Sequence, residues 1–202
     1  MKDGFVKVAA VTPELKVADI KFNTSRICSY IDEAVAGGNK VIAFPELCIT
    51  GYTCQDLFLQ DRLIEGARSA LSVVASHTEE IDALIIVGLP LEIFGKLYNV
   101  AAVINRGKIL GIVPKTHLPN YNEFYEARHF RSGANVHTTT MIGSREVPVD
   151  TKLIFCCESM PSLRIAIELC EDLWVPNPPS VSHCMAGATL IANLSASDEI
   201  TG

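Results

Sequence analysis

Hydrophobic residues in the first half of the chain follow two periods, which together predict alternating helices and strands. Helical spacing predicts one helix that is capped by Asn23 and ended by Gly37-Gly38, and a second helix over residues 61–77. Continuous apolar runs flank these helices, and such runs are typical of strands buried on both faces. The predicted strands cover residues 6–11, 41–44 and 83–89.

The middle of the chain departs from this pattern. Residues 98–105 and 109–113 are joined by Arg106-Gly107-Lys108, a short link whose glycine suits a hairpin between antiparallel strands. Residues 116–131 have no clean period and are rich in aromatic and charged residues, so we expect an ordered functional loop. The whole pattern predicts an α/β protein with a mixed sheet. Three later strands are predicted over residues 153–157, 163–169 and 189–194. A helix is predicted over residues 178–186, ended by Gly187.

Composition narrows the class of protein. The 202-residue chain is 49% hydrophobic and has a formal charge of −6 without a cluster of Lys or Arg. This suits one domain with a buried core, and it argues against nucleic acid as a partner. No apolar run approaches the roughly 20 residues of a membrane span, and the first residues lack a secretory pattern. We therefore expect a cytoplasmic protein without a membrane partner.

Seven cysteines are scattered along the chain, an odd number that does not suggest a disulfide framework in a cytoplasmic protein. Cys48 and Cys54 form no CxxC pair and have no histidine close by in the sequence, so we expect packing or loop roles and no zinc site. A single cysteine is more often a small buried hydrophobic residue than a catalyst. We interpret four others in this way: Cys28, Cys156, Cys157 and Cys184.

Cys170 differs because it lies where a predicted strand gives way to a turn. A free thiol has a pKa of roughly 8.5, so a working cysteine nucleophile needs a base or a positive charge nearby. Two other predicted strands end in such groups, since Glu46 follows strand 41–44 and Lys115 follows the second hairpin strand. Loops at one edge of a sheet build the sites of α/β proteins, so these three side chains can meet.

Together the three groups would form a covalent catalyst. Glu46 can accept the thiol proton, Cys170 can attack an acyl carbon, and Lys115 can stabilise negative charge on the substrate oxygen. An ammonium beside a carboxylate stays protonated, so this pair can act as base and oxyanion partner together. The backbone N–H of Glu171 is a natural second donor to the oxyanion.

Three motifs contain these residues: FPEL around Glu46, YNVAAVINRGKILGIVPKTHLPN around Lys115 and LCEDLW around Cys170. They resemble the nitrilase (carbon-nitrogen hydrolase) superfamily, over almost the whole chain. Within it, GYTCQDLFLQ, PNYNEFYEARHF and NLSAS are similar to the branch of glutaminase domains found in glutamine-dependent NAD+ synthetases. The resemblance implies a four-layer α-β-β-α sandwich with mixed sheets. It also implies hydrolysis of the glutamine side-chain amide through a cysteine thioester, with ammonia passed on to make NAD+ from deamido-NAD+.

The same resemblance implies roles for individual residues. Glu46 corresponds to the base, Lys115 to the oxyanion stabiliser and Cys170 to the nucleophile of the family pattern. Glu123 matches a second glutamate that many members place beside the triad, and no metal is implied. Five further residues fall where relatives of this branch line the glutamine pocket: Tyr121, Phe124, Glu171, Trp174 and Ser197.

Synthetase domains of this branch carry a Ser-Gly-Gly-x-Asp-Ser loop for ATP, and the chain has no match to it. We therefore expect residues 1–202 to be a glutaminase domain, truncated at its C-terminal end and separated from its synthetase domain. No cofactor is implied for amide hydrolysis, and ATP and Mg²⁺ are implied only for the missing synthetase. Expected partners are glutamine, a synthetase domain or subunit that receives ammonia, and further copies of the chain in a homo-oligomer.

The glutamates and the lysine also have simpler interpretations. Glu46 and Lys115 can be ordinary loop or surface charges, and Glu123 can equally be a loop ion-pair former. Glu126, three residues further on, is interpreted as an ion-pair partner of Arg128 or Arg131.

Other classes of function also stay open. Another carbon-nitrogen hydrolase, of the ω-amidase or N-carbamoyl amidase type, would use the same three residues. A non-catalytic assembly subunit would keep only the fold. Two rival hydrolase classes would use other groups: a Cys-His enzyme would use His117, His129 or His183, and an isochorismatase-type enzyme would use Asp19 or Asp56.

Overall fold

The computed structural model describes residues 4–197, and no helix among them is long and apolar enough to cross a membrane. Its helices are α1 (Ile20–Ala36), α2 (Asp61–His77) and α3 (Pro179–Met185), with the 3₁₀ turns η1 (Tyr52–Leu59), η2 (Glu126–Arg128) and η3 (Cys170–Leu173). Its strands are β1 (Val8–Ala10), β2 (Val41–Ala43), β3 (Leu84–Ile93), β4 (Lys96–Asn105), β5 (Lys108–Pro114), β6 (His137–Ile142), β7 (Arg145–Asp150), β8 (Ile154–Cys156), β9 (Arg164–Leu169) and β10 (Leu190–Leu194).

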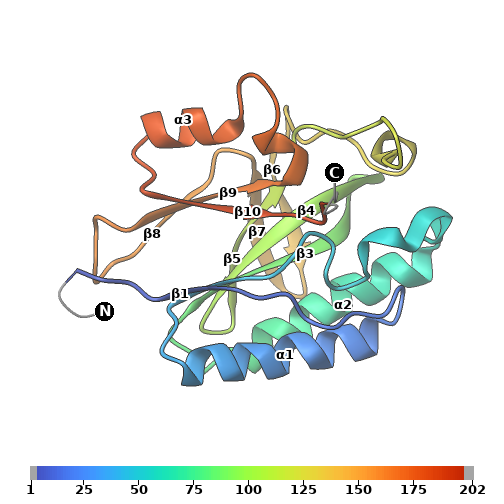
Figure 1. Ribbon diagram of the computed structural model, residues 1–202. Helices are drawn as coiled ribbons and strands as arrows, with labels where there is room; N and C mark the ends of the chain where they lie inside the picture. Colours follow the sequence, from blue (N-terminus) through green and yellow to red (C-terminus); the bar gives the residue numbers. More distant parts are fainter. Residues whose placement is uncertain (1–3, 198–202) are drawn as a thin grey trace, which may run out of the picture.

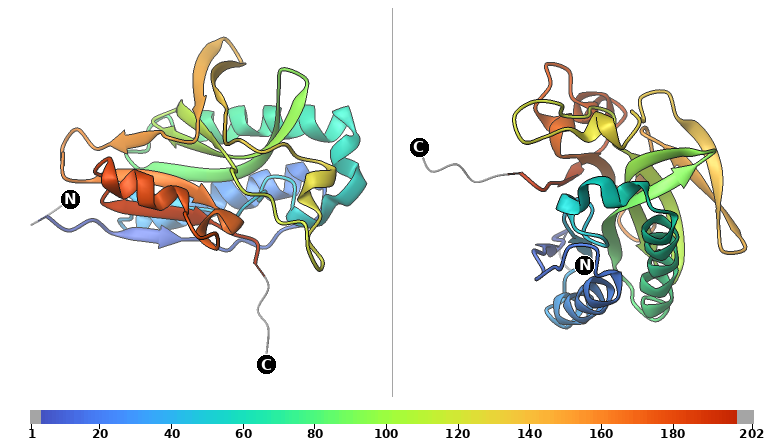
Figure 2. Two further views of the ribbon diagram at one scale, coloured as in Figure 1. Left: turned by 90° about the horizontal axis from the view of Figure 1, so that it is seen from above. Right: turned by 90° about the vertical axis from the view of Figure 1, so that its right-hand side faces the viewer.

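These strands form two sheets that pack face to face between helices (Figure 1). The large sheet has the order β1-β2-β3-β4-β5-β7-β6, and the small sheet has the order β10-β9-β8. Helices α1 and α2 cover the outer face of the large sheet, and α3 lies over the small sheet, as the end-on view in Figure 2 also shows. Parallel and antiparallel neighbours occur in both sheets. The predicted α-β-β-α sandwich with mixed sheets is therefore confirmed.

Two hydrophobic layers hold the sandwich together. Ile85 of β3 packs with α1 and α2, whereas the next residue, Ile86, packs with Ile167 of the small sheet, and all three side chains are almost fully buried. Successive residues of a strand point to opposite faces, so a strand between two layers must be apolar throughout. Burial of each such side chain contributes roughly 1.5–3 kcal/mol. The continuous apolar run in the sequence thus follows from the position of β3.

The start of the first helix differs from the prediction. Asp19 caps α1, because its side chain accepts the backbone N–H of Phe22 at 3.0 Å. Asn23 lies one turn inside the helix and is fully buried. Its amide nitrogen donates to the carbonyls of Lys16 at 2.8 Å and Ile49 at 3.1 Å. Asn23 therefore holds two loops against the helix. Its side chain forms hydrogen bonds with backbone groups, as a cap residue does, but these groups belong to other segments.

The predicted hairpin is present, and a second one was missed. β4 and β5 pair antiparallel, and both Arg106 and Gly107 have the positive φ angles, 46° and 72°, that a two-residue type I′ turn requires. β6 and β7 form another antiparallel hairpin, and β7 joins β5 in parallel. Its strands are largely exposed and polar, so they lack a clear hydrophobic period.

Two cysteines expected to be buried are exposed instead. Cys156 points outward near the end of β8, and Cys184 lies on the outer side of α3. Cys28 and Cys157 are half-buried, while Cys48 and Cys54 are buried as packing residues. The prediction was wrong for Cys156 and Cys184 because residue type alone does not show which face of a short element a side chain occupies.

Candidate active site

The three sequence-predicted catalytic residues follow three strands whose carboxyl ends lie together. β2 is parallel to β3, and two antiparallel pairings through β4 leave β5 pointing the same way as β2. Glu46 follows β2 and Lys115 follows β5, while Cys170 follows β9 of the facing sheet. Their exposed fractions are 1%, 0% and 5%. Lys115 and Glu46 are in contact in a buried space between the two sheets, and Cys170 lies close enough for both of their charges to affect the pKa of its thiol.

The backbone around Glu46 rests directly on the sheet. A Cβ atom added to Gly88 of β3 would lie 2.6 Å from the carbonyl oxygen of Pro45, so only glycine permits this approach. Asn99 of β4 donates its side-chain N–H to Glu46 Oε1 at 2.7 Å. Burial raises the pKa of Glu46, and the nearby ammonium of Lys115 opposes this effect. Glu46 is thus a fixed carboxylate with more proton affinity than an exposed glutamate.

The Lys115 ammonium lies between two carboxylates. Its Nζ atom is 2.6 Å from Glu46 Oε1 and 2.6 Å from Glu126 Oε1. Burial alone would lower the pKa of Lys115, but the two negative charges outweigh burial and raise it. Lys115 therefore stays protonated at neutral pH, which suits a group that stabilises an oxyanion and does not suit a general base.

The second glutamate beside the triad is Glu126, and the matching of Glu123 to this position is corrected. Glu126 is 5% exposed, binds Lys115 and also accepts the hydroxyl of Tyr52 at 2.7 Å. Glu123 is exposed and lies at the rim of a neighbouring cavity. Arg128, the expected partner of Glu126, binds Asp56 instead. The turn η2 causes this arrangement because it directs Glu126 inward.

The backbone at Cys170 is strained. Its φ angle is 43°, in the left-handed region that residues other than glycine rarely adopt, directly after the extended residue Leu169. Burial raises the pKa of the Cys170 thiol, the charge of Glu46 raises it further, and Ser197 and Lys115 lower it. Ser197 Oγ lies 3.5 Å from Cys170 Sγ. The thiol is therefore mostly protonated at rest and needs the carboxylate to ionise it during attack.

The structure places the five residues implied for the glutamine pocket at different depths and does not bring all of them to the Cys170 centre. The hydroxyl of Tyr121 donates to Glu171 Oε2 at 2.8 Å, so these two side chains lie together near Cys170. Phe124 packs edge-on against Tyr121 and lines the neighbouring cavity. Ser197 contacts the thiol, whereas Trp174 is 69% exposed on the outside of η3.

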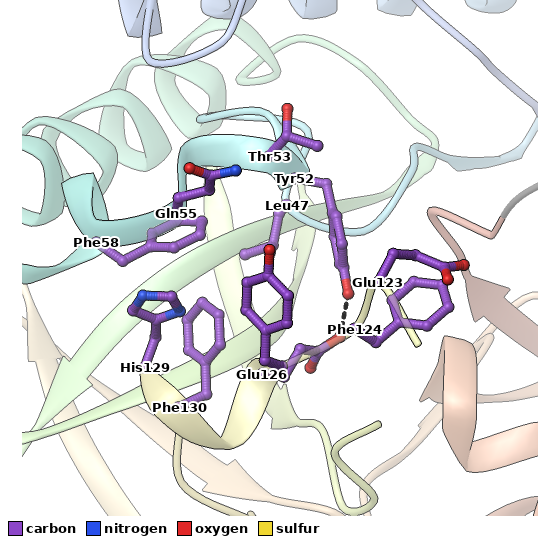
Figure 3. Close-up of a pocket in the computed structure, with 11 residues that line it drawn as sticks. Leu47, Tyr52, Thr53, Gln55, Phe58, Glu123, Phe124, Glu126, His129 and Phe130 are labelled. Atoms are coloured by element: carbon purple, nitrogen blue, oxygen red, sulfur yellow. Dashed lines mark hydrogen bonds between the residues drawn. The ribbon is translucent and has the colours of Figure 1, made fainter. Parts of the chain in front are cut away.

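A cavity of about 80 Å³ lies beside Glu126 (Figure 3). The side chains of Tyr52 and Glu126 point toward each other on one side of it, and Phe58, His129 and Phe130 form the opposite wall (Figure 3). Both η1 and the loop 116–131 contribute to the lining. The predicted functional loop is thus ordered. It supplies Glu126 and, from the aromatic wall, His129 and Phe130.

Three polar residues of the site were missed in the sequence. Asn99 holds Glu46, Tyr52 holds Glu126, and the buried carboxylate of Asp172 accepts backbone N–H groups. Asn99 carried a usable signal, because it is a lone amide inside the apolar run 97–104 and a buried amide needs a partner. Tyr52 and Asp172 lie in turns without a period and carried no comparable signal.

The groups required by the rival hydrolases have partners other than Cys170 within the described part of the chain. His129 Nε2 is 3.0 Å from Asp56, and His183 Nε2 is 2.8 Å from the carbonyl of Thr151. Asp19 caps α1. His117 binds Asp172 through its backbone N–H, and among residues 4–197 its side chain forms no hydrogen bond to Cys170. The geometry therefore favours a Glu-Lys-Cys arrangement over a Cys-His pair or an Asp-based one.

The fold and this arrangement together define a carbon-nitrogen hydrolase. The family model described as carbon-nitrogen hydrolase matches residues 7–200, so the chain belongs to this family. Among solved structures, an amidase from Nesterenkonia sp. shares the fold, with a TM-score of 0.70 at 19% identity, covering 96% of this chain and 66% of the amidase.

Relatives with higher identity belong to one branch. Glutamine-dependent NAD(+) synthetases of Mycobacterium bovis and Mycobacterium tuberculosis are 38% identical over 194 residues, which is 96% of this chain and 29% of theirs. The crystal structure of a glutamine-dependent NAD(+) synthetase from Cytophaga hutchinsonii matches with a TM-score of 0.85 and 30% identity, covering 98% of this chain and 31% of that one. The chain thus spans about three-tenths of the length of these relatives.

Proposed function

We propose that this chain hydrolyses the side-chain amide of glutamine through a thioester on Cys170. The observation that carries the proposal is the buried Lys115 ammonium held between Glu46 and Glu126 beside a strained cysteine. A buried charge is costly unless it is paired, so its presence at a strand end suggests chemical use. The similarity to glutamine-dependent NAD(+) synthetases supports glutamine as the amide.

Acylation begins with proton transfer from Cys170 to Glu46 as sulfur attacks the amide carbon. Glu46 Oε2 is buried and has no hydrogen-bond partner among residues 4–197, which leaves it available for this proton. The oxygen that becomes negative is stabilised by Lys115 Nζ and by the backbone N–H of Glu171. The tetrahedral intermediate then expels nitrogen, which takes the proton from Glu46 and leaves as ammonia. The product bound to the enzyme is a γ-glutamyl thioester.

Deacylation repeats the sequence with water. Glu46 accepts a proton from water as its oxygen attacks the thioester carbon, and Lys115 again stabilises the oxyanion. Collapse of this second intermediate breaks the C–S bond, and the Cys170 sulfur recovers a proton from Glu46. Glutamate leaves and the resting thiol is restored. Glu126 keeps Lys115 protonated and fixed through both stages, and no cofactor enters the reaction.

Recognition of the amino-acid end of glutamine is assigned to the outer part of the site. Glu171 can bind the substrate ammonium, while the hydroxyls of Tyr121 and Ser197 can donate to its carboxylate. Phe124 packs beside Tyr121 and would cover the aliphatic part of the substrate. Trp174 would act only at the entrance, since most of its side chain is exposed.

The destination of the ammonia is also part of the proposal. We infer that residues 1–202 are the glutaminase part of an enzyme whose synthetase domain or subunit converts deamido-NAD+ to NAD+ with ATP and Mg²⁺. The names of the relatives, and the fact that they are about three times longer, support this partner. A cytoplasmic, homo-oligomeric enzyme is the corresponding expectation, and the net charge of −6 suits a small-molecule substrate.

The proposal is tested by incubating the full-length protein with glutamine and measuring both ammonia and the thioester adduct on Cys170. Cys170→Ala should abolish both signals, and unchanged turnover in this variant would reject covalent catalysis. His117→Ala and Lys115→Ala provide a matched pair, since the proposal expects only the lysine change to be crippling. If acetamide or a carbamoyl amino acid is turned over and glutamine is not, the chemistry stands and the assigned substrate is wrong.

A further inference from the structure

The side chain of Asp172 connects the two halves of the active site. It is 1% exposed and lies two residues after Cys170, in the turn η3. Its Oδ2 atom accepts the backbone N–H of Leu169 at 3.1 Å, and its Oδ1 atom accepts those of His117 at 2.7 Å and Thr116 at 3.1 Å. One carboxylate thus binds three N–H groups, one from the last residue of β9 in the small sheet and two from the loop that follows β5 of the large sheet.

The positions of these donors are informative. Leu169 is the residue immediately before the nucleophile, and Thr116 is the residue immediately after Lys115. The large and the small sheet carry Lys115 and Cys170 respectively, so their spacing depends on how the two carboxyl edges are joined. Hydrophobic packing between the sheets is not directional and cannot fix this spacing by itself.

We propose that Asp172 is a positioning residue that sets the distance between the Cys170 sulfur and the Lys115 ammonium. It does not touch the substrate and acts through the backbone on either side of the two catalytic residues. This inference rests on the function proposed above, because it assigns Asp172 a role in the same reaction.

The chemistry of the carboxylate fits this task. An ionised carboxylate only accepts hydrogen bonds and has about four lone-pair sites, so it can satisfy three converging N–H donors. An asparagine has the same shape but would place an NH₂ group against some of those donors. The strained φ angle of 43° at Cys170 also needs an external restraint, and the bond from Leu169 supplies one directly before it.

The test compares Asp172→Asn with the natural sequence in the full-length protein. Misplacement of a reacting group by 1 Å can cost about 100-fold, so we expect kcat for glutamine to fall about 100-fold while KM changes by less than about threefold. Hydrogen exchange followed by mass spectrometry should show faster exchange in peptides covering residues 115–118 and 168–172. The hydrophobic strands β3 and β4 should keep their protection.

Glu168→Gln is the matched control. Glu168 is another buried carboxylate of the same segment, but it accepts from Ser180 N at 3.0 Å and from the Asn193 side chain, away from Lys115. This variant should leave exchange at residues 115–118 unchanged. If it accelerates exchange there as much as Asp172→Asn does, the effect is a general loosening and the proposal is wrong.

Two outcomes separate this proposal from the proposed function. A folded Asp172→Asn protein whose kcat stays within about threefold of the natural value would overturn the positioning role. A natural protein that releases no ammonia from glutamine would instead reject the proposed function, whatever the variant does. Where Asp172→Asn yields no folded protein, Asp172→Ser keeps one acceptor for the three donors and is judged by the same limits.

Discussion

The active site contains two ion-containing regions that differ in depth. Lys115, Glu46 and Glu126 form an ion-paired centre that is almost fully buried, whereas Tyr121 and Glu171 meet at a rim where the tyrosine is 51% exposed. Charges interact strongly in a low-dielectric interior and weakly in water. The comparison teaches that the residues proposed for the chemistry are anchored in the sandwich, whereas those proposed for substrate recognition form weak interactions that are easily exchanged.

Replacing Lys115 by Met should have the largest effect. Removal of one oxyanion donor typically costs about 2.7–4 kcal/mol, so glutamine turnover should fall about 100- to 1,000-fold. Two buried carboxylates would lose their cation, and breaking such a pair typically destabilises a protein by about 3–5 kcal/mol. Glu46 already has a raised pKa, so the folded variant would bind more protons than the unfolded chain and the loss should shrink as the pH falls toward about 5.

Kinetic assays and urea denaturation at several pH values check this result. Lys152→Met, at an exposed position, is the control and should change neither quantity. Equal destabilisation by both variants would show that the ion pairs of the buried Lys115 contribute no more to the stability of the protein than an exposed lysine does.

The two glutamates of the loop provide a sharper comparison. Glu126→Gln removes a charge that holds Lys115, and we expect kcat to fall about 10- to 100-fold because hydrogen bonds to charged groups contribute about 1.5–3 kcal/mol. Glu123→Gln, at an exposed position three residues earlier, should change kcat by less than about threefold. Steady-state kinetics of both variants decide the point, and a larger loss in Glu123→Gln would reverse the assignment.

The reactivity of Cys170 should depend on pH in a defined direction. Its pKa is raised by burial and by Glu46, so its thiolate should appear only above about pH 8.5, the ordinary midpoint of a free cysteine. Alkylation by iodoacetamide, followed peptide by peptide, should be about tenfold slower at pH 7 for Cys170 than for the exposed Cys184. A midpoint below pH 7 for Cys170 would indicate a preformed thiolate–ammonium pair and contradict the proposed proton transfer to Glu46.

The smallest effect is expected at the rim. Tyr121→Phe removes an exposed hydrogen bond worth about 0.5–1.5 kcal/mol at most, so KM for glutamine should rise by about threefold while kcat and thermal stability stay unchanged. Tyr125→Phe, a tyrosine of the same loop that is 50% exposed, is the control. A large drop in thermal stability for Tyr121→Phe would mean that the rim is part of the structural core.

The sequence predicted most of the fold and three buried residues of the site from strong strand and helix signals. Helix 61–77 was predicted with its final bounds because one apolar face repeats over four turns. Glu46, Lys115 and Cys170 were found because each follows a strand signal and lies in a motif that resembles the carbon-nitrogen hydrolase family. The β6–β7 hairpin escaped because most of its residues are polar and exposed, so Ile142, Val147 and Val149, which do reach the core, are too few to give a clear hydrophobic period.

Predictions for single residues were wrong where contacts between distant segments determine the role of a side chain. Asn23 resembled a helix cap, but contacts with Lys16, in the loop before α1, and with Ile49, in a loop distant in the sequence, determine its use. The choice between Glu123 and Glu126 depended on a single turn in a loop without periodicity. Local pattern cannot specify which of two carboxylates three residues apart faces inward, because both spacings are compatible with the same irregular backbone.

Gly88 has a consequence for engineering the enzyme. Because the backbone of the Pro45-Glu46 turn lies against a bare Cα on β3, the base is set by the sheet and moves only if the sheet moves. The outer aromatic residues can therefore be varied in directed evolution toward other amides without displacing the base. A single methyl group at Gly88, by contrast, would disturb catalysis for every substrate at once.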